Sequence, residues 1–307
     1  MSTNLIIKDF SMKLGVIGGS GLYSIDGLKI TDKISSDTPF GKPSDSYLSG
    51  TIGDLEIVFL PRHGEGHTIS PSEINHRANI YGMKKLGVTH ILSFSAVGSL
   101  QAHLPPKDIV VVDQYFDRTK QSEKHTFFRD GIAAHIPFGE PICPEFRNLV
   151  FEQAKLAIKS IYGLGEGKPK AVNGGTYVNM EGPAFSTKAE SKYYRACGFD
   201  LIGMTSLAEA KLAREAEICY TAVAMVTDFD CWHSEHDSVS VDMVVETMKS
   251  NIKTAKEILS NTVKVFKTLK RHCPCPHALN GAIMTSKDKI TPEIRASLDV
   301  IAGKHLK

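Results

Sequence analysis

The segment from Ile218 to Trp232, ICYTAVAMVTDFDCW, constrains the fold more than any other part of the sequence. Its first ten residues are uncharged and rich in Val and Ala, which is typical of a strand buried on both faces of a parallel sheet. The segment ends with two carboxylates, Asp228 and Asp230. Because desolvating an unpaired carboxylate is costly, we expect these acids to reach a pocket at the end of the strand.

Other apolar, strand-like runs alternate with helical patterns along the chain. Besides the opening stretch, the predicted strands lie at 13–19, 55–61, 90–97, 108–113 and 174–180. The alternation predicts an α/β fold, a single domain with a central mixed, largely parallel sheet flanked by helices. We place this domain at residues 1–270 and a C-terminal extension, which contains a CPC segment, at 271–307.

Two helices are marked clearly. In SPSEINHRANIYGMKKLG, Ser70 is a predicted N-cap, Pro71 the first helical residue, Glu73 the second half of a capping box and Gly87 the stop. Apolar residues at helical spacing predict a second, long amphipathic helix over about 240–270, packed on the sheet.

Composition excludes several classes of protein. A chain of 307 residues with 42% hydrophobic and 23% charged residues is typical of an ordinary globular protein. Its formal charge of +2 is too small to predict a nucleic-acid or membrane-surface partner. Since the N-terminal stretch lacks a signal-peptide pattern and no run of 18 apolar residues occurs, we expect a cytoplasmic protein.

Six cysteines in a chain of this length do not predict a disulfide framework. Cys273 and Cys275 could close a strained, reducible ring, and Cys143 could pair with Cys219, but reduced thiols fit a cytosolic protein at least as well. The sequence leaves these pairings open.

Two glycine-containing segments suit an anion. In GVIGGSGLYS, backbone N–H groups around Ser20 can approach a phosphate, although a plain tight turn explains the pattern equally well. In LPRHGEGHTISP, Arg62 offers a fork of donors and His63 a further one. Two rival interpretations of the second segment are a solvated loop and a metal site made by His63, Glu65 and His67.

Three further segments add weaker signals. Ser95 and Ala96 end a strand before a turn at Gly98, where open α/β sheets bind ligands. Thr205 lies near the start of a predicted helix, where anions are stabilised. Phe185 and Met204 fit a pocket wall or the core.

In combination, these segments resemble the methylthioadenosine phosphorylase branch of the trimeric purine nucleoside phosphorylase family. The shared motifs span about residues 13–270 in family order and are GVIGGSGLY, TPFGKPSD, PRHGEGH, INHRANIYGMKKLG, SAVGSL, EGPAFST, AES, GMT, EICY and TDFDCW. The resemblance implies a homotrimer or a dimer of trimers and no metal or organic cofactor. It also implies two small-molecule partners, a nucleoside and inorganic phosphate as co-substrate.

The resemblance also implies the roles of individual residues. The implied phosphate contacts are Ser20, Arg62, His63, Ser95, Ala96 and Thr205. The implied contacts to the ribose and base are Phe185, Met204, Asp228, Phe229 and Asp230, with Ser186 and Val241 shaping substrate choice. His135 resembles a residue that such proteins lend to the pocket of a neighbouring subunit.

The two acids suit adenine as the leaving base. Its 6-amino group donates hydrogen bonds, and its N7 must gain a proton for the base to leave as a neutral purine. We assign Asp228 to N7 and Asp230 to the amino group, although the sequence gives no firm grounds for this order. The 6-oxo group of a 6-oxopurine is an acceptor and would face an ionised carboxylate, which is also an acceptor. We therefore expect the protein to discriminate against inosine, and Asp230→Asn should weaken this discrimination.

The predicted reaction is phosphorolysis of S-methyl-5'-thioadenosine to adenine and 5-methylthioribose-1-phosphate. A broad-specificity or 6-oxopurine nucleoside phosphorylase is the alternative within the enzyme class. An alternative outside the enzyme class is a nucleoside-binding protein without turnover. The segment TDFDCW could also serve as a helix cap, or form a metal-binding cluster with His233, Glu235, His236 and Asp237.

Overall fold

A mixed sheet forms the centre of the computed structural model, which describes residues 12–19, 22, 27–233 and 241–307. Its 11 strands are β1 (Leu14–Gly18), β2 (Leu28–Ile34), β3 (Tyr47–Ile52), β4 (Leu55–Pro61), β5 (His90–Ser99), β6 (Ile109–Val111), β7 (Gln114–Arg118), β8 (Ala171–Asn173), β9 (Thr176–Met180), β10 (Leu201–Gly203) and β11 (Cys219–Asp228). The helices are α1 (His76–Lys85), α2 (Pro144–Tyr162), α3 (Lys188–Ala196), α4 (Ser206–Glu215), α5 (Val241–Phe266) and α6 (Pro292–Ala302).

Strand β5 is the hub of the sheet. It pairs in parallel with both β1 and β11, and β1 pairs in parallel with β4. The end of β5 also pairs antiparallel with β10, which leads through β9 to β7. Antiparallel pairs β3–β4, β2–β3 and β6–β11, together with the parallel pair β6–β8, complete the mixed sheet.

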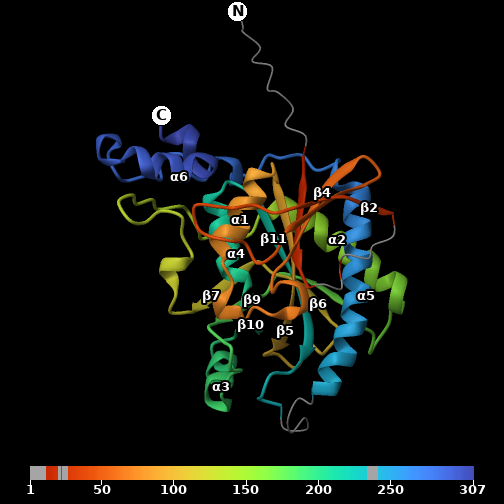
Figure 1. Cartoon of the computed structure of the whole chain (residues 1–307). Helices are drawn as coiled ribbons and strands as arrows, with labels where there is room; N and C mark the ends of the chain where they lie inside the picture. The colour runs from red at the N-terminus through yellow and green to blue at the C-terminus, as the bar shows by residue number, and fades with distance from the viewer. Residues whose placement is uncertain (1–11, 20–21, 23–26, 234–240) are drawn as a thin grey trace, which may run out of the picture.

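Helices cover both faces of this sheet, as Figure 1 shows. Alternate residues of β11 point to opposite faces. Tyr220 and Ala222 therefore pack in one cluster with α1 and α4, while Cys219 and Val223 pack in the other with α2 and α5. Every residue of β11 except Asp228 is buried, which confirms the doubly buried strand and the α/β fold predicted from the sequence.

The helix predicted from Ser70 begins later than expected. Glu73 accepts a hydrogen bond from the Ser70 backbone N–H at 3.2 Å, so the two residues do interact as a capping box would require, but they enclose only a 3-10 turn, Pro71–Glu73. The ψ angle of 125° at Ile74 then breaks the helical path. A second cap follows, in which Asn75 Oδ1 accepts from the Ala78 N–H at 3.1 Å, and α1 begins at His76.

The segment after α5 packs back onto the rest of the protein. Leu279, Ile290 and Leu298 are buried in the cluster that also contains α1 and α4 residues. Cys273 and Cys275 are buried in the opposite cluster. Helix α6 lies near α1, at the end of the molecule away from α3 (Figure 1). Residues 271–307 therefore contribute to both faces of the core.

Candidate active site

The carboxyl ends of four strands gather at one edge of the sheet, because β1, β4, β5 and β11 all run in the same direction. Arg62 and His63 directly follow β4, Ser95 and Ala96 lie in the last part of β5, and Asp228 ends β11. Residues that the sequence placed on separate segments are thus brought to a common edge, where open α/β sheets bind ligands.

The two acids form a compact pair. Asp228 Oδ1 accepts the backbone N–H of Asp230 at 2.8 Å, and Asp228 Oδ2 accepts the hydroxyl of Thr227 at 2.7 Å. The turn needs a φ of +51° at Asp230, a left-handed conformation that aspartate tolerates better than most residues.

Gly98 packs directly against both acids. A methyl group at this position would lie 3.2 Å from Asp228 Oδ1 and 3.3 Å from Asp230 Cβ. The glycine that the sequence offers as a turn residue therefore continues β5 and leaves space for the two carboxylates.

The environment separates the two carboxylates chemically. Burial, with a further contribution from the charge of Asp228, raises the pKa of Asp230. Asp228 instead accepts two hydrogen bonds from within the protein, which fix the position of its carboxylate. Burial therefore favours the protonated form of Asp230.

Arg62 lies in a buried ion-pair network rather than at the surface of a cavity. Its Nε lies 2.5 Å from Glu209 Oε1, its Nη1 donates to the Phe94 carbonyl at 2.9 Å, and its Nη2 donates to Ser93 Oγ at 2.7 Å. A fourth hydrogen bond, of 3.3 Å, joins Nη2 to Glu209 Oε2. Since a guanidinium group has five N–H donors, only one remains for a ligand in this conformation.

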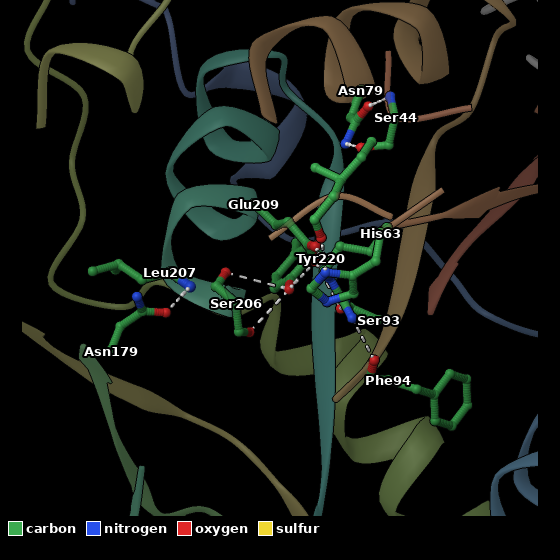
Figure 2. A network of polar contacts seen from close by, with 12 residues as sticks. Ser44, His63, Asn79, Ser93, Phe94, Asn179, Ser206, Leu207, Glu209 and Tyr220 are labelled. Carbon is green, nitrogen blue, oxygen red and sulfur yellow. Dashed lines mark hydrogen bonds and ion pairs between the residues drawn. The ribbon is translucent and has the colours of Figure 1, made fainter. Parts of the chain in front are cut away.

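Glu209 is the centre of this network, as Figure 2 shows, although sequence reasoning did not identify it. Besides Arg62, it accepts hydrogen bonds from Ser93 Oγ at 2.7 Å and from the Tyr220 hydroxyl at 2.8 Å. The available signal is weak: Glu209 shares a face of α4 with Ser206 and Ala213, small residues that allow close packing on the sheet.

Both members of the ion pair remain charged. In Arg62, burial would lower the pKa, but Glu209 more than offsets it and the net shift is upward. In Glu209, burial would raise the pKa, but the Arg62 guanidinium and its hydrogen bond leave it below the ordinary value. The network therefore presents little net charge to a phosphate.

His63 lies beside this network in Figure 2. Its Nδ1 is 2.9 Å from the Ile69 carbonyl, so Nδ1 carries the proton and Nε2 is left as an acceptor. Burial, and then the charge of Arg62, lower the pKa of His63 to about 4. At neutral pH His63 can thus bind a phosphate by accepting a hydrogen bond from its protonated oxygen, whereas the sequence had suggested a donor.

The other three described phosphate candidates differ in exposure. Ser95 is buried, and within the described part of the chain no group forms a hydrogen bond with its Oγ. Thr205 is buried at the N-cap of α4, but the N–H of Leu207 is satisfied by Asn179 Oδ1 at 3.1 Å instead. Ala96 is exposed. The Thr205 hydroxyl therefore does not cap α4, and the Ser95 hydroxyl is buried at the end of β5.

Candidate contacts to the sugar and base lie around the loop before α3. The Phe185 ring is 84% exposed, whereas Ser186 is linked to the acid segment because its carbonyl accepts from Cys231 Sγ at 3.3 Å. Met204 lines a cavity of about 20 Å³, which has room for about one water molecule. Phe229 follows Asp228 directly and stacks on His233, with ring centroids 4.8 Å apart.

The remaining candidates are less well placed or fall outside the description. His135 is exposed, and its backbone N–H donates to the Ala282 carbonyl at 2.8 Å, in the C-terminal segment. Ser20 lies outside the described residues, as do three of the four residues proposed to cluster with TDFDCW, namely Glu235, His236 and Asp237. Val241 begins α5, but its side chain is outside the description.

The rival metal site at His63 is not assembled. Its ring stacks on that of His67, with centroids 4.1 Å apart. In the described ranges, the one group of three or more potential ligands that converge closely consists of four cysteines and contains neither histidine. Among the described helices, none is long and apolar enough to cross a membrane.

Known proteins match nearly the whole chain. Residues 13–264 match the family model described as Phosphorylase superfamily. An S-methyl-5'-thioadenosine phosphorylase of Geobacter sulfurreducens is 48% identical over 95% of this chain and 99% of its own length. A second, from Koribacter versatilis, is 48% identical over 95% of this chain and 96% of its own length.

Solved structures agree with these relatives. A methylthioadenosine phosphorylase from an antarctic soil metagenomic library has a TM-score of 0.88 and 40% identity, covering 95% of this chain and 99% of that one. A methylthioadenosine phosphorylase from Schistosoma mansoni in complex with adenine has a TM-score of 0.78 and 37% identity, covering 95% of this chain and 98% of that one.

Proposed function

The chain belongs to the phosphorylase superfamily, and from that premise we propose that it cleaves S-methyl-5'-thioadenosine with inorganic phosphate. The products are adenine and 5-methylthioribose-1-phosphate, so the enzyme is a pentosyltransferase of purine and methionine salvage. The observation that carries the assignment is the pair formed by Asp228 and Asp230 over Gly98, in a chain whose relatives carry this activity.

The acid pair recognises and activates adenine. Asp230, whose pKa is raised by burial, donates a proton to N7 as the bond from C1' to the base breaks. Asp228, held in place by hydrogen bonds from the Thr227 hydroxyl and the Asp230 N–H, accepts from the 6-amino group. The proposed order is the reverse of the one expected from the sequence, and it rests on the raised pKa of Asp230.

Phosphate is both nucleophile and electrostatic partner. An oxygen of phosphate forms the new bond to C1', and its negative charge stabilises the oxocarbenium character of the sugar. We propose that Ser95 and Thr205 donate hydroxyl hydrogen bonds, and that the Ala96 N–H and the one remaining Arg62 N–H add donors. His63 Nε2 accepts a hydrogen bond from the protonated oxygen of the phosphate. Ser20 completes this proposed set.

The sugar side and the assembly rest on fewer observations. We propose that Phe185, Met204 and Phe229 contact the nucleoside, and that Ser186 and Val241 tune the preference at its 5' end. The exposed His135 would complete the pocket of a neighbouring subunit in a homotrimer or a dimer of trimers. We further propose a cytoplasmic enzyme that needs no metal or organic cofactor for the chemical step, because phosphate and the two acids supply a nucleophile and a proton.

The test is the release of free base from S-methyl-5'-thioadenosine, adenosine and inosine, each with and without phosphate. We expect phosphate-dependent adenine release from S-methyl-5'-thioadenosine, slower release from adenosine and none from inosine. Release without phosphate would indicate a hydrolase. Inosine cleavage would indicate a 6-oxopurine or broad-specificity phosphorylase, and tight binding without turnover would indicate a binding protein.

A further inference from the structure

Four cysteines converge at the opposite end of β11 from the acid pair. They are Cys143, Cys219, Cys273 and Cys275, and their sulfur atoms all lie within 4.8 Å of one another. Each is buried and none forms a disulfide. The other two cysteines of the chain, Cys197 and Cys231, lie outside the cluster.

The four thiols come from three separate elements. Cys143 is the N-cap of α2, Cys219 begins β11, and Cys273 and Cys275 belong to the segment after α5. Pro274 separates the last two, so one short turn directs both of their sulfur atoms into the same space. The cluster therefore joins the start of α2 and the start of β11 to the C-terminal segment.

The spacing fits one tetrahedral ion. With zinc–sulfur bonds of about 2.3 Å, tetrahedral geometry places ligand sulfur atoms about 3.8 Å apart. The Cys219 and Cys273 sulfur atoms are 3.4 Å apart, and the whole set falls within 4.8 Å. Small inward or outward shifts of side chains would reach ideal positions without moving the backbone elements.

Near the cluster lie two buried nitrogen atoms that lack hydrogen-bond partners among the described residues, and one of them belongs to a cationic arginine. Arg271 lies two residues before Cys273 and donates through Nη2 to the Glu217 carbonyl at 3.0 Å. Its buried Nε has no hydrogen-bond partner among the described residues. The ring of His90 packs against Phe146 and Phe266, and its buried Nε2 also has none. These two nitrogen atoms can turn toward an anionic tetrathiolate centre.

We propose that Cys143, Cys219, Cys273 and Cys275 bind a structural zinc ion. On binding, each thiol gives its proton to water and each sulfur forms one bond to the metal, so a dication and four thiolates make a centre of net charge −2. Four protein ligands leave no open position, which is the pattern of structural rather than catalytic zinc. Soft thiolates select such an ion over magnesium or calcium.

The ion would fasten the segment that positions His135. Beyond the cluster, the Ala282 carbonyl accepts from the His135 N–H at 2.8 Å, and Ile283 pairs with Ala134. Thr285 Oγ1 accepts from the Ala133 N–H at 2.8 Å. An ion bound at Cys273 and Cys275 would therefore hold the start of the C-terminal segment in place, and with it the loop at 133–135 that pairs with this segment.

The first measurement is the metal content of the full-length protein, purified under reducing conditions without an affinity tag. Elemental analysis should find about one zinc per chain, with no more than trace amounts of other metals. Cobalt exchange should give the thiolate charge-transfer band and the visible bands of a tetrahedral cobalt site. Removal of the ion with a strong chelator should lower the thermal midpoint by about 5 °C or more.

Serine variants then locate the ion. Cys143→Ser and Cys275→Ser should lose zinc and the cobalt spectrum, whereas Cys197→Ser, a matched change at an exposed cysteine outside the cluster, should keep both. Wild-type protein settles the question even where a variant does not fold. Metal-free protein in which all six cysteines titrate as thiols after unfolding would overturn the proposal in favour of simple packing. A mass lower by two hydrogen atoms per bond would overturn it in favour of disulfides.

Discussion

Replacing Glu209 with glutamine should destabilise the protein far more than such a small change would at the surface. The side chains of Arg62 and Glu209 are only 4% and 1% exposed. Removing one partner of a buried ion pair costs about 3–5 kcal/mol, because the remaining charge stays buried without compensation. Counting hydrogen bonds gives a similar loss of stability. The glutamine NH2 group cannot accept from the donors that now face one oxygen of the carboxylate, and each unsatisfied group costs about 1–3 kcal/mol.

Urea unfolding followed by circular dichroism measures this loss, provided that the denaturant slope is unchanged. The matched control is Glu152→Gln, because Glu152 pairs with Lys155 at the surface, with 57% and 48% of the side chains exposed. That variant should lose at most about 1 kcal/mol. Combining Glu209→Leu with Arg62→Met should recover much of the loss, since neither charge then remains buried.

The pH dependence provides an independent check of the same pair. Because the pKa of Glu209 is lowered in the folded protein, its contribution is complete above the ordinary carboxyl pKa of 4.5 and is lost as pH falls through the folded value. Glu209→Gln should remove that part of the acid limb. A glutamine variant within about 1 kcal/mol of wild type at pH 7 would refute the reasoning, because Arg62 would then not depend on Glu209.

Three further predictions concern the acid pair, Gly98 and a buried histidine. Asp230→Asn should lower kcat/KM by about 10²–10⁴-fold, while Asp228→Asn should weaken discrimination against inosine; an exchange of these two phenotypes would restore the order expected from the sequence. Gly98→Ala should reduce kcat/KM by roughly tenfold or more with a smaller change in thermal midpoint, because the new methyl group would lie 3.2 Å from Asp228 Oδ1. Activity equal to that of the wild type would show that the two acids move freely. Burial lowers the pKa of His76 to about 3, so stability should fall as pH drops from about 6.5 toward 3, by up to about 1.4 kcal/mol per pH unit. His76→Leu should flatten this part of the profile of thermal midpoint against pH. An unchanged slope would count against a role of His76 in the loss of stability.

The parts of the fold that the sequence predicted carry their signal in one continuous stretch. Strand β11 is ten residues long and almost wholly buried, so its apolar run alone identifies it. The strands β8 and β10 have three residues each, too few for a period to appear, and both escaped prediction. Strand β2 is mostly exposed and contains two lysines and an aspartate, so it lacks the apolar pattern of a core strand.

The candidate site divides in the same way. Asp228 and Asp230 are recognisable because they interrupt an apolar strand at its end, and the structure places them together. Glu209 meets Arg62 across 147 positions of sequence, and no local pattern encodes that meeting. The number of free N–H groups on Arg62 and the proton position on His63 depend on such distant partners, so they could be determined only from the structure.

Strand β11 connects the two sites that matter most for the enzyme. It begins at Cys219 in the cysteine cluster and ends at Asp228 in the acid pair, so about 30 Å of extended chain separates them. Zinc removal therefore cannot act on the carboxylates directly. Since β11 is buried between two helical layers and paired with β5 along its length, it should hold its register without the ion. We therefore expect the metal to govern thermal stability and the His135 segment, while the pH profile set by the acids stays the same.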